Sequence, residues 1–158
     1  MQLSQAIEQF CVAMLANRRS PATIDCYRRD LLALLRFSGD PPVSEVTPDW
    51  IHRFVVSPAV QCKPDGLPRS EVTINRSKAA LRSFGAWMVD AGLADRNPAG
   101  RLSIRRTTRQ SPSVLSDSER KRMLREVGAR KGELANRDQV LLELRLGTGI
   151  RLAELVGL

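Results

Sequence analysis

The sequence predicts an all-α protein, and three observations favour this fold class. Of its 158 residues, 42% are hydrophobic but only 4% are aromatic, and leucine and alanine are plentiful. This composition suits helices better than sheets. Apolar residues recur every three or four positions, which is the period of one helix face. Helix-start signals such as Ser20-Pro21 and Thr47-Pro48 precede these runs.

Four helical patterns occupy the first hundred residues, enough for a compact bundle. Their expected spans are about 3–16, 20–38, 47–55 and 70–91. The apolar faces of the first and last patterns are Leu3, Ile7, Phe10 and Met14, and Ile74, Leu81, Phe84 and Met88. Residues 57–70 contain three prolines and a Pro-Asp-Gly turn, so we expect an exposed loop there.

A basic stretch follows this bundle. Residues 99–114 contain four arginines, no acidic residue and no sustained periodicity. We expect an extended basic linker, and the alternative is a disordered spacer that happens to be basic. The expected organisation is therefore a helical domain over residues 1–98, a linker over 99–114 and the start of a second domain over 115–158.

Residues 115–158 also show helical patterns. Ser116 and Glu119 form an S-x-x-E capping box that predicts a fifth helix. A sixth helix is expected over residues 140–146, and the Gly-Thr-Gly sequence that follows is expected to end it. A further helical pattern then opens with Arg151 in its first turn. Such an arginine near free backbone N–H groups suits an anion, although most arginines near helix starts are solvated surface residues.

The net charge of +8 is concentrated in one part of the chain. Residues 1–75 are balanced, residues 76–116 carry a net charge of +6, and residues 117–158 carry +2. A localised basic segment indicates a nucleic-acid surface, less often an anionic membrane, whereas a solubility surface would scatter its charge.

Other classes of protein receive little support. The three cysteines form no C-x-x-C pair, which argues against a disulfide framework and a zinc site. No apolar run reaches membrane-spanning length, and the N-terminus lacks a signal-peptide pattern. We expect a cytoplasmic protein with no metal, no cofactor and no membrane partner.

The phrase Thr148-Gly149-Ile150-Arg151, followed by Glu154-Leu155, resembles the first-arginine motif of the tyrosine recombinases, or phage integrases. Members of that family show T-G-[LI]-R-x-x-E-L at this point. The resemblance implies that Arg151 would hold the scissile phosphate of a DNA backbone and that Glu154 would help to position it. It also implies that residues 115–158 would be the first helices of a truncated α+β catalytic domain.

The first domain is similar to the family's SAM-like core-binding domain. Two phrases carry this resemblance: S-x-x-T-x-x-x-Y-x-x-D-L from Ser20, and T-[IV]-N-R from Thr73. The pattern L-R-x-[FL] from Leu81 and the later Asn97-Pro98 also match. Gly85 departs from the family, and because a mid-helix glycine costs roughly 1 kcal/mol relative to alanine, it marks either close packing or drift.

The resemblance also implies where DNA would bind. The residues expected to contact DNA are Ser20, Thr23, Arg76 and Arg82 in the first domain, and Arg105, Arg106 and Arg109 in the linker. The expected partners are double-stranded DNA and, in the intact family, other recombinase protomers that form a tetramer on two DNA sites.

The chemistry of the family needs a nucleophilic tyrosine. The only tyrosine here, Tyr27, falls in a binding-domain phrase, and the only histidine, His52, lacks the family's H-x-x-R context. We therefore expect the chain as written to bind DNA without cleaving it. Two alternatives remain open: a stand-alone DNA-binding protein that competes for recombination sites, and a helical protein–protein adaptor that grips an acidic partner.

Overall fold

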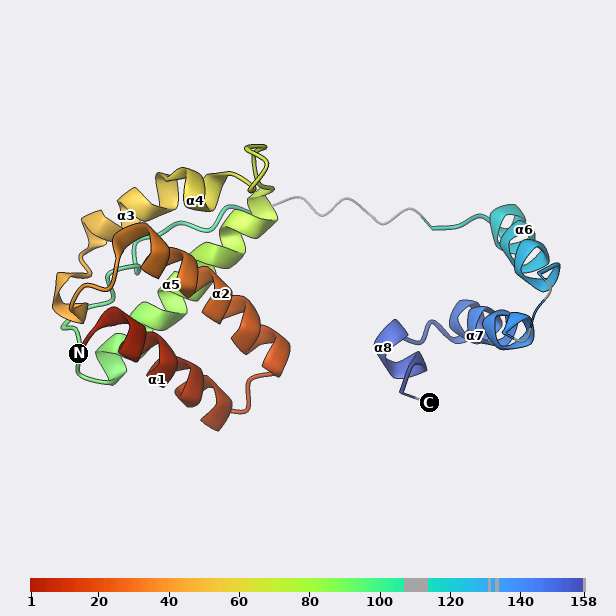
Figure 1. Cartoon of the computed structure of the whole chain (residues 1–158), viewed down its shortest axis with the longest axis horizontal. Coiled ribbons are helices and arrows are strands. Elements are labelled where there is room, and N and C mark those ends of the chain that lie inside the picture. The colour runs from red at the N-terminus through yellow and green to blue at the C-terminus, as the bar shows by residue number, and fades with distance from the viewer. Residues whose placement is uncertain (107–113, 131, 133, 158) are drawn as a thin grey trace. The chain divides into compact units, whose positions relative to one another are not determined.

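The computed structural model describes residues 1–106, 114–130, 132 and 134–157. These residues fall into two compact units, Met1–Thr108 and Arg109–Leu158, which are described separately. In the described residues, all regular elements are helices, apart from two isolated β-bridges. The predicted all-α class is therefore confirmed (Figure 1).

The first unit is a bundle in which four longer helices dominate. Its elements are α1 (Leu3–Ala16), α2 (Pro21–Ser38), the 3-10 turn η1 (Val43–Glu45), α3 (Pro48–Val56), α4 (Pro58–Gln61) and α5 (Glu71–Asp90). The predicted start signals operate as expected. The hydroxyl oxygens of Ser20 and Thr47 accept hydrogen bonds from backbone N–H groups in the first turns of α2 and α3, and a proline occupies the first position of each helix.

The core lies where α1, α2 and α5 meet (Figure 1). All eight residues predicted for the apolar faces of α1 and α5 are buried, with exposed fractions of 6% or less. Side chains from α3 and α4 complete the same cluster, among them Phe54 and Val60. The helical period in the sequence thus predicted the inward faces correctly.

The predicted exposed loop over residues 57–70 needs a correction. Its first part forms α4, which buries Val60 to 2% exposure. Pro58 stands at the first position of this helix, where its missing N–H has no partner to lose. The tip, residues 63–68, is exposed throughout, and an isolated bridge between Cys62 and Pro68 closes it.

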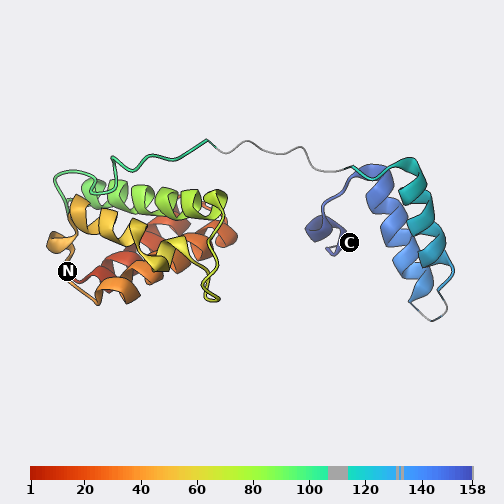
Figure 2. The same ribbon diagram turned by 90° about the horizontal axis from the view of Figure 1, so that it is seen from above.

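Residues 97–106, which we call the strap, run beside α5 from its C-terminal end back towards its N-terminal end (Figure 2). Ala99 and Leu102 belong to the core of the first unit, with exposed fractions of 1% and 6%. The sequence had placed both residues in an extended linker. Because two apolar side chains at this spacing are too few to show a period, their burial could not be seen in the sequence.

The second unit contains α6 (Asp117–Gly128), α7 (Ala135–Thr148) and the single turn α8 (Leu152–Leu155). The capping box is confirmed: Ser116 Oγ accepts from Glu119 N, and a Glu119 carboxylate oxygen accepts from Ser116 N at 2.8 Å. These hydrogen bonds from Ser116 lower the pKa of the Glu119 carboxyl below its ordinary value.

Helix α7 is longer than predicted. It begins five residues before Val140 and runs through Gly147, so the predicted Gly-Thr-Gly break acts only at Gly149, whose φ of 71° ends the helix. Several apolar side chains of this unit are exposed, among them Val140 at 61% and Val156 at 78%, whereas Leu155 is buried. No helix in the described part of the chain is long and apolar enough to cross a membrane.

Candidate nucleic-acid interface

The stretch Thr73-Ile74-Asn75-Arg76 in the first turns of α5 gives each residue a different task. Thr73 N donates to Ser70 Oγ, which caps the helix, and Ile74 lies in the core. Arg76 reaches across to α2, and Asn75 reaches to the strap. The four residues therefore join three separate segments of the first unit at one helix end.

Arg76 forms a bidentate ion pair with Asp30 of α2. Its Nε and Nη2 atoms lie 3.1 Å from the two carboxylate oxygens, and Ser77 Oγ donates to one of them at 3.1 Å. The Asp30 side chain is only 8% exposed, whereas that of Arg76 is 41% exposed. The hydrogen bond to Asp30 raises the pKa of Arg76 above its ordinary value. A bidentate pair uses two of the five guanidinium N–H groups and leaves the outer edge of Arg76 available to another acceptor.

Asn75 clasps the strap at Arg105. Its Nδ2 donates to the Arg105 carbonyl at 2.7 Å, and its Oδ1 accepts from Arg105 N at 3.2 Å. One turn along α5, Lys78 Nζ donates to the Ser103 carbonyl at 3.2 Å. Arg105 also lies 3.9 Å from Glu71. The strap's arginines are thereby held beside the beginning of α5.

The other end of the strap is fixed by Asn97. Its Nδ2 donates to the Arg82 carbonyl at 2.9 Å, and its Oδ1 accepts from Ala99 N at 2.9 Å. A Cβ on Gly85 would stand 2.1 Å from this Oδ1 atom. Of the two explanations that the sequence left open for Gly85, the structure favours close packing, because the missing side chain makes room for Asn97.

Replacing Gly85 with alanine is expected to lower the free energy of unfolding of the first unit by about 1–2 kcal/mol. Alanine gains about 1 kcal/mol in helix propensity. That gain is outweighed, because the new methyl group displaces Asn97 and breaks two hydrogen bonds worth about 1 kcal/mol each, in addition to the repacking cost. Urea unfolding followed by tryptophan fluorescence measures this loss, since both tryptophans, Trp50 and Trp87, lie in the first unit.

The control is the same change in an Asn97→Ala background. With the Asn97 amide removed, the close contact disappears, and Gly85→Ala should become neutral or stabilising. An equal loss in both backgrounds would contradict the packing explanation.

Basic side chains gather around the first two turns of α5. We define the α5 basic surface by its five members: Arg69, Arg76, Lys78, Arg105 and Arg106. Arg69 is fixed by a 2.7 Å hydrogen bond from its Nε to the Cys62 carbonyl. Asp30 and Glu71 neutralise part of this charge, and Arg106 is exposed.

The other predicted DNA contacts are distributed more widely. Ser20 and Thr23 lie at the start of α2, where their hydroxyl oxygens are 2.8 Å apart and Ser20 caps the helix. Arg82 is exposed on α5, about one turn beyond Lys78. Arg109 lies outside the described residues. Tyr27 packs against the core, and His52 is exposed on α3. Contact with DNA stays a prediction for all of the predicted positions.

In the second unit, Arg151 and Glu154 form one pair. Arg151 Nη1 lies 3.2 Å from Glu154 Oε1, and Glu154 Oε2 accepts from Arg151 N at 2.9 Å. The Arg151 side chain is 84% exposed. Arg151 stands just before α8 and not in its first turn, which corrects the sequence-based placement. The catalytic roles of both residues stay predictions.

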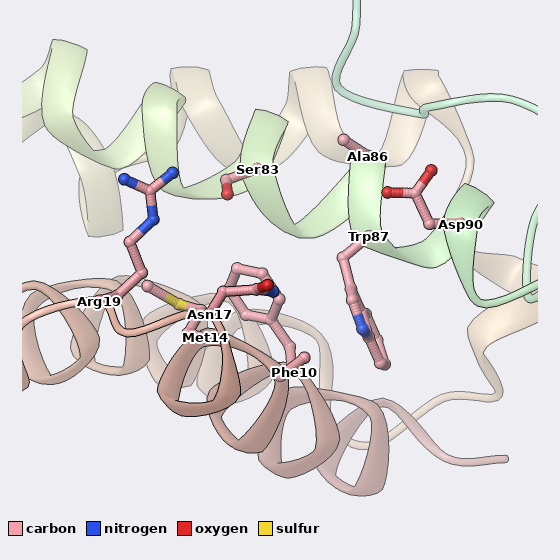
Figure 3. Close-up of a pocket in the computed structure, with 9 residues that line it drawn as sticks. Phe10, Met14, Asn17, Arg19, Ser83, Ala86, Trp87 and Asp90 are labelled. Atoms are coloured by element: carbon pink, nitrogen blue, oxygen red, sulfur yellow. The ribbon is translucent and has the colours of Figure 1, made fainter.

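A polar hollow of about 460 Å³ lies between α1 and α5, outside the α5 basic surface. Figure 3 shows Trp87, Ser83 and Asp90 of α5 on one side, facing Phe10 and Met14 of α1. In the described residues, no group of histidine, cysteine and acidic side chains could hold a metal ion.

Sequence reasoning missed the partners that organise this interface. In the sequence, Asp30 and Asn75 are only parts of motifs that match the family, and Lys78 belongs to none of them. Each of their partners lies 25 or more residues away. Only the matching phrases signalled that these polar residues had a task.

Comparison with known proteins identifies the family. Residues 7–92, more than half of the chain, match the family model described as phage integrase, N-terminal SAM-like domain. The protein named tyrosine recombinase XerC from Corynebacterium efficiens is 33% identical over 162 residues, which cover 99% of this chain and 48% of that protein. Its namesake from Chromohalobacter salexigens is 36% identical over 157 residues, covering 97% of this chain and 50% of that protein.

The chain thus spans about half the length of the curated relatives that it matches. No solved structure matches it. The matched region contains α2, α3 and α5 with most of α1, the helices that build the first unit. The chain belongs to the tyrosine recombinase family, and its first unit carries that family's phage-integrase N-terminal SAM-like domain.

Proposed function

We propose that this chain binds double-stranded DNA as the binding part of a site-specific tyrosine recombinase, and that the α5 basic surface contacts the DNA backbone. The observation that carries the proposal is the fixed arrangement of Arg76, Lys78 and Arg105 around one helix end. Lysine and arginine side chains that neutralise phosphates release counterions, and this release supplies much of the affinity for DNA.

The proposal extends to the second unit. Arg151 would hold the scissile phosphate, and Glu154 would orient its guanidinium group through the pair that the two residues form. Guanidinium N–H groups that do not face Glu154 would bind the phosphate oxygens. The relatives' name, tyrosine recombinase, supports a part in recombination. Recombination would require further protomers, which form a tetramer on two DNA sites.

The test measures how strongly DNA binding depends on salt. Fluorescence anisotropy of the full chain with a labelled 30-base-pair duplex should show binding that weakens steeply as KCl rises. The logarithm of the association constant should fall against the logarithm of the KCl concentration with a slope of about −0.9 per phosphate neutralised. Replacing Arg105 and Arg106 together by glutamine should weaken binding about equally for all duplexes and reduce the slope by about two.

A charge-matched control replaces Arg36 and Arg53, which are exposed on α2 and α3, by glutamine. This variant carries the same net charge but leaves the α5 basic surface intact, so the slope should change little. A Kd that does not depend on salt would refute DNA binding. Equal effects of the two double variants would refute the location proposed here.

A further inference from the structure

We infer that Asn75 is a positioning residue, which fixes Arg105 and Arg106 beside α5 before DNA arrives. This inference rests on the proposed DNA binding and adds the device that orders its surface. Neither the family match nor the names of the relatives assigns a task to Asn75.

The geometry of the clasp favours a specific role for an asparagine. The side-chain amide donates to the carbonyl of Arg105 and accepts from the N–H of the same residue. It thus pairs with both backbone groups of one residue, as the opposite residue of a neighbouring antiparallel strand would. An amide side chain donates through its nitrogen and accepts through its oxygen, whereas a carboxylate only accepts and an aliphatic side chain does neither.

The clasp is the outermost of three attachments of the strap to α5. Asn97 attaches the strap to Arg82 in the middle of α5, and Lys78 holds it at Ser103. Burial of Ala99 and Leu102 fixes the part between them. Beyond Ser103, Ile104 is 43% exposed and contributes little burial. The backbone of Arg105 is therefore held by Asn75, with Glu71 as a distant ion-pair partner at 3.9 Å.

Loss of the clasp is expected to lower the affinity for DNA without changing the charge of the α5 basic surface. A basic segment that is already ordered loses less conformational entropy on binding than a loose one. Asn75→Ala removes the clasp but keeps every positive charge. We therefore expect the Kd for duplex DNA to rise about three- to tenfold, with an unchanged salt slope. The Arg105 and Arg106 double variant, by contrast, changes the slope.

The experiment compares the full-length wild type with Asn75→Ala and Ser103→Ala. Ser103 serves as the matched control, because only its backbone carbonyl, and not its side chain, accepts the hydrogen bond from Lys78. Without DNA, the Arg105 amide should exchange its hydrogen about tenfold faster in Asn75→Ala and at the wild-type rate in Ser103→Ala. The thermal midpoint from tryptophan fluorescence should change little, since no core contact is lost.

The outcomes separate this inference from the proposed function. Faster exchange with weaker binding at an unchanged slope supports the positioning role. An unchanged exchange rate, or faster exchange with an unchanged Kd, overturns it while DNA binding stands. If the wild type binds no duplex, the proposed function fails and the positioning role fails with it. Should Asn75→Ala fail to fold, Asn75→Leu decides by the same exchange measurement, because a leucine of similar size neither accepts from the Arg105 N–H nor donates to the Arg105 carbonyl.

Discussion

Replacing Phe84 with alanine is expected to destabilise the first unit by about 3–5 kcal/mol, the cost of removing a fully buried aromatic ring and leaving a cavity. Phe84 is 1% exposed. Its ring meets Phe10 of α1 edge-on at a centroid distance of 5.5 Å and stacks near Trp87 at 5.9 Å. The variant therefore loses both burial and the contact that joins α5 to α1. Urea unfolding of the full chain, followed by tryptophan fluorescence, measures the effect.

The hollow beside this cluster sharpens the prediction. Phe10 and Trp87 line it, but Phe84 does not (Figure 3). Water therefore reaches Trp87 at the edge of this cluster but not the ring of Phe84. The matched control is Phe37→Ala, since Phe37 is 42% exposed and packs on Phe54 at a centroid distance of 5.4 Å. We expect the control to lose about 1 kcal/mol. Similar losses for the two variants would show that Phe84 is not the centre of this core.

The sequence predicted those parts of the fold that depend on nearby residues. The caps at Ser20, Thr47 and Ser116 are short-range hydrogen bonds, and each was found where its pattern placed it. The buried faces of α1 and α5 were predicted because helix geometry brings every third or fourth residue to one side. The motifs that resemble the family also predicted the correct family, because they lie within the region that matches its N-terminal domain or follow it along the chain.

Contacts between distant segments could not be predicted in this way. The pairs Asp30–Arg76, Asn75–Arg105 and Gly85–Asn97 are separated by 46, 30 and 12 positions. No periodic pattern reports such partners, because polar side chains on a helix surface look the same whether they face water or another segment. For this reason Arg76 was predicted as a DNA contact alone, although the structure also gives it a partner within the protein.

The ion pair between Asp30 and Arg76 gives the second large effect. Asp30→Ala is expected to lower the free energy of unfolding of the first unit by about 2–3 kcal/mol. The carboxylate accepts three hydrogen bonds, from Arg76 Nε, Arg76 Nη2 and Ser77 Oγ. Breaking a fully buried pair typically costs about 3–5 kcal/mol. The expected loss is smaller here because Arg76 is 41% exposed and water can solvate it, while Ser77 keeps a weak bond to the Thr73 carbonyl.

Glu8→Ala is the matched control for this prediction. The Glu8–Arg28 pair also joins two helices, α1 and α2, with a short contact of 2.7 Å, but both of its side chains are about half exposed. An exposed pair contributes about 0–1 kcal/mol, so the control should change the urea midpoint little. A double variant, Asp30→Ala with Arg76→Ala, should lose less than the sum of the two single losses, because it leaves no partner without its counter-charge. Additive losses would mean that Asp30 and Arg76 do not stabilise each other, and that Arg76 is free to act on DNA without help from α2.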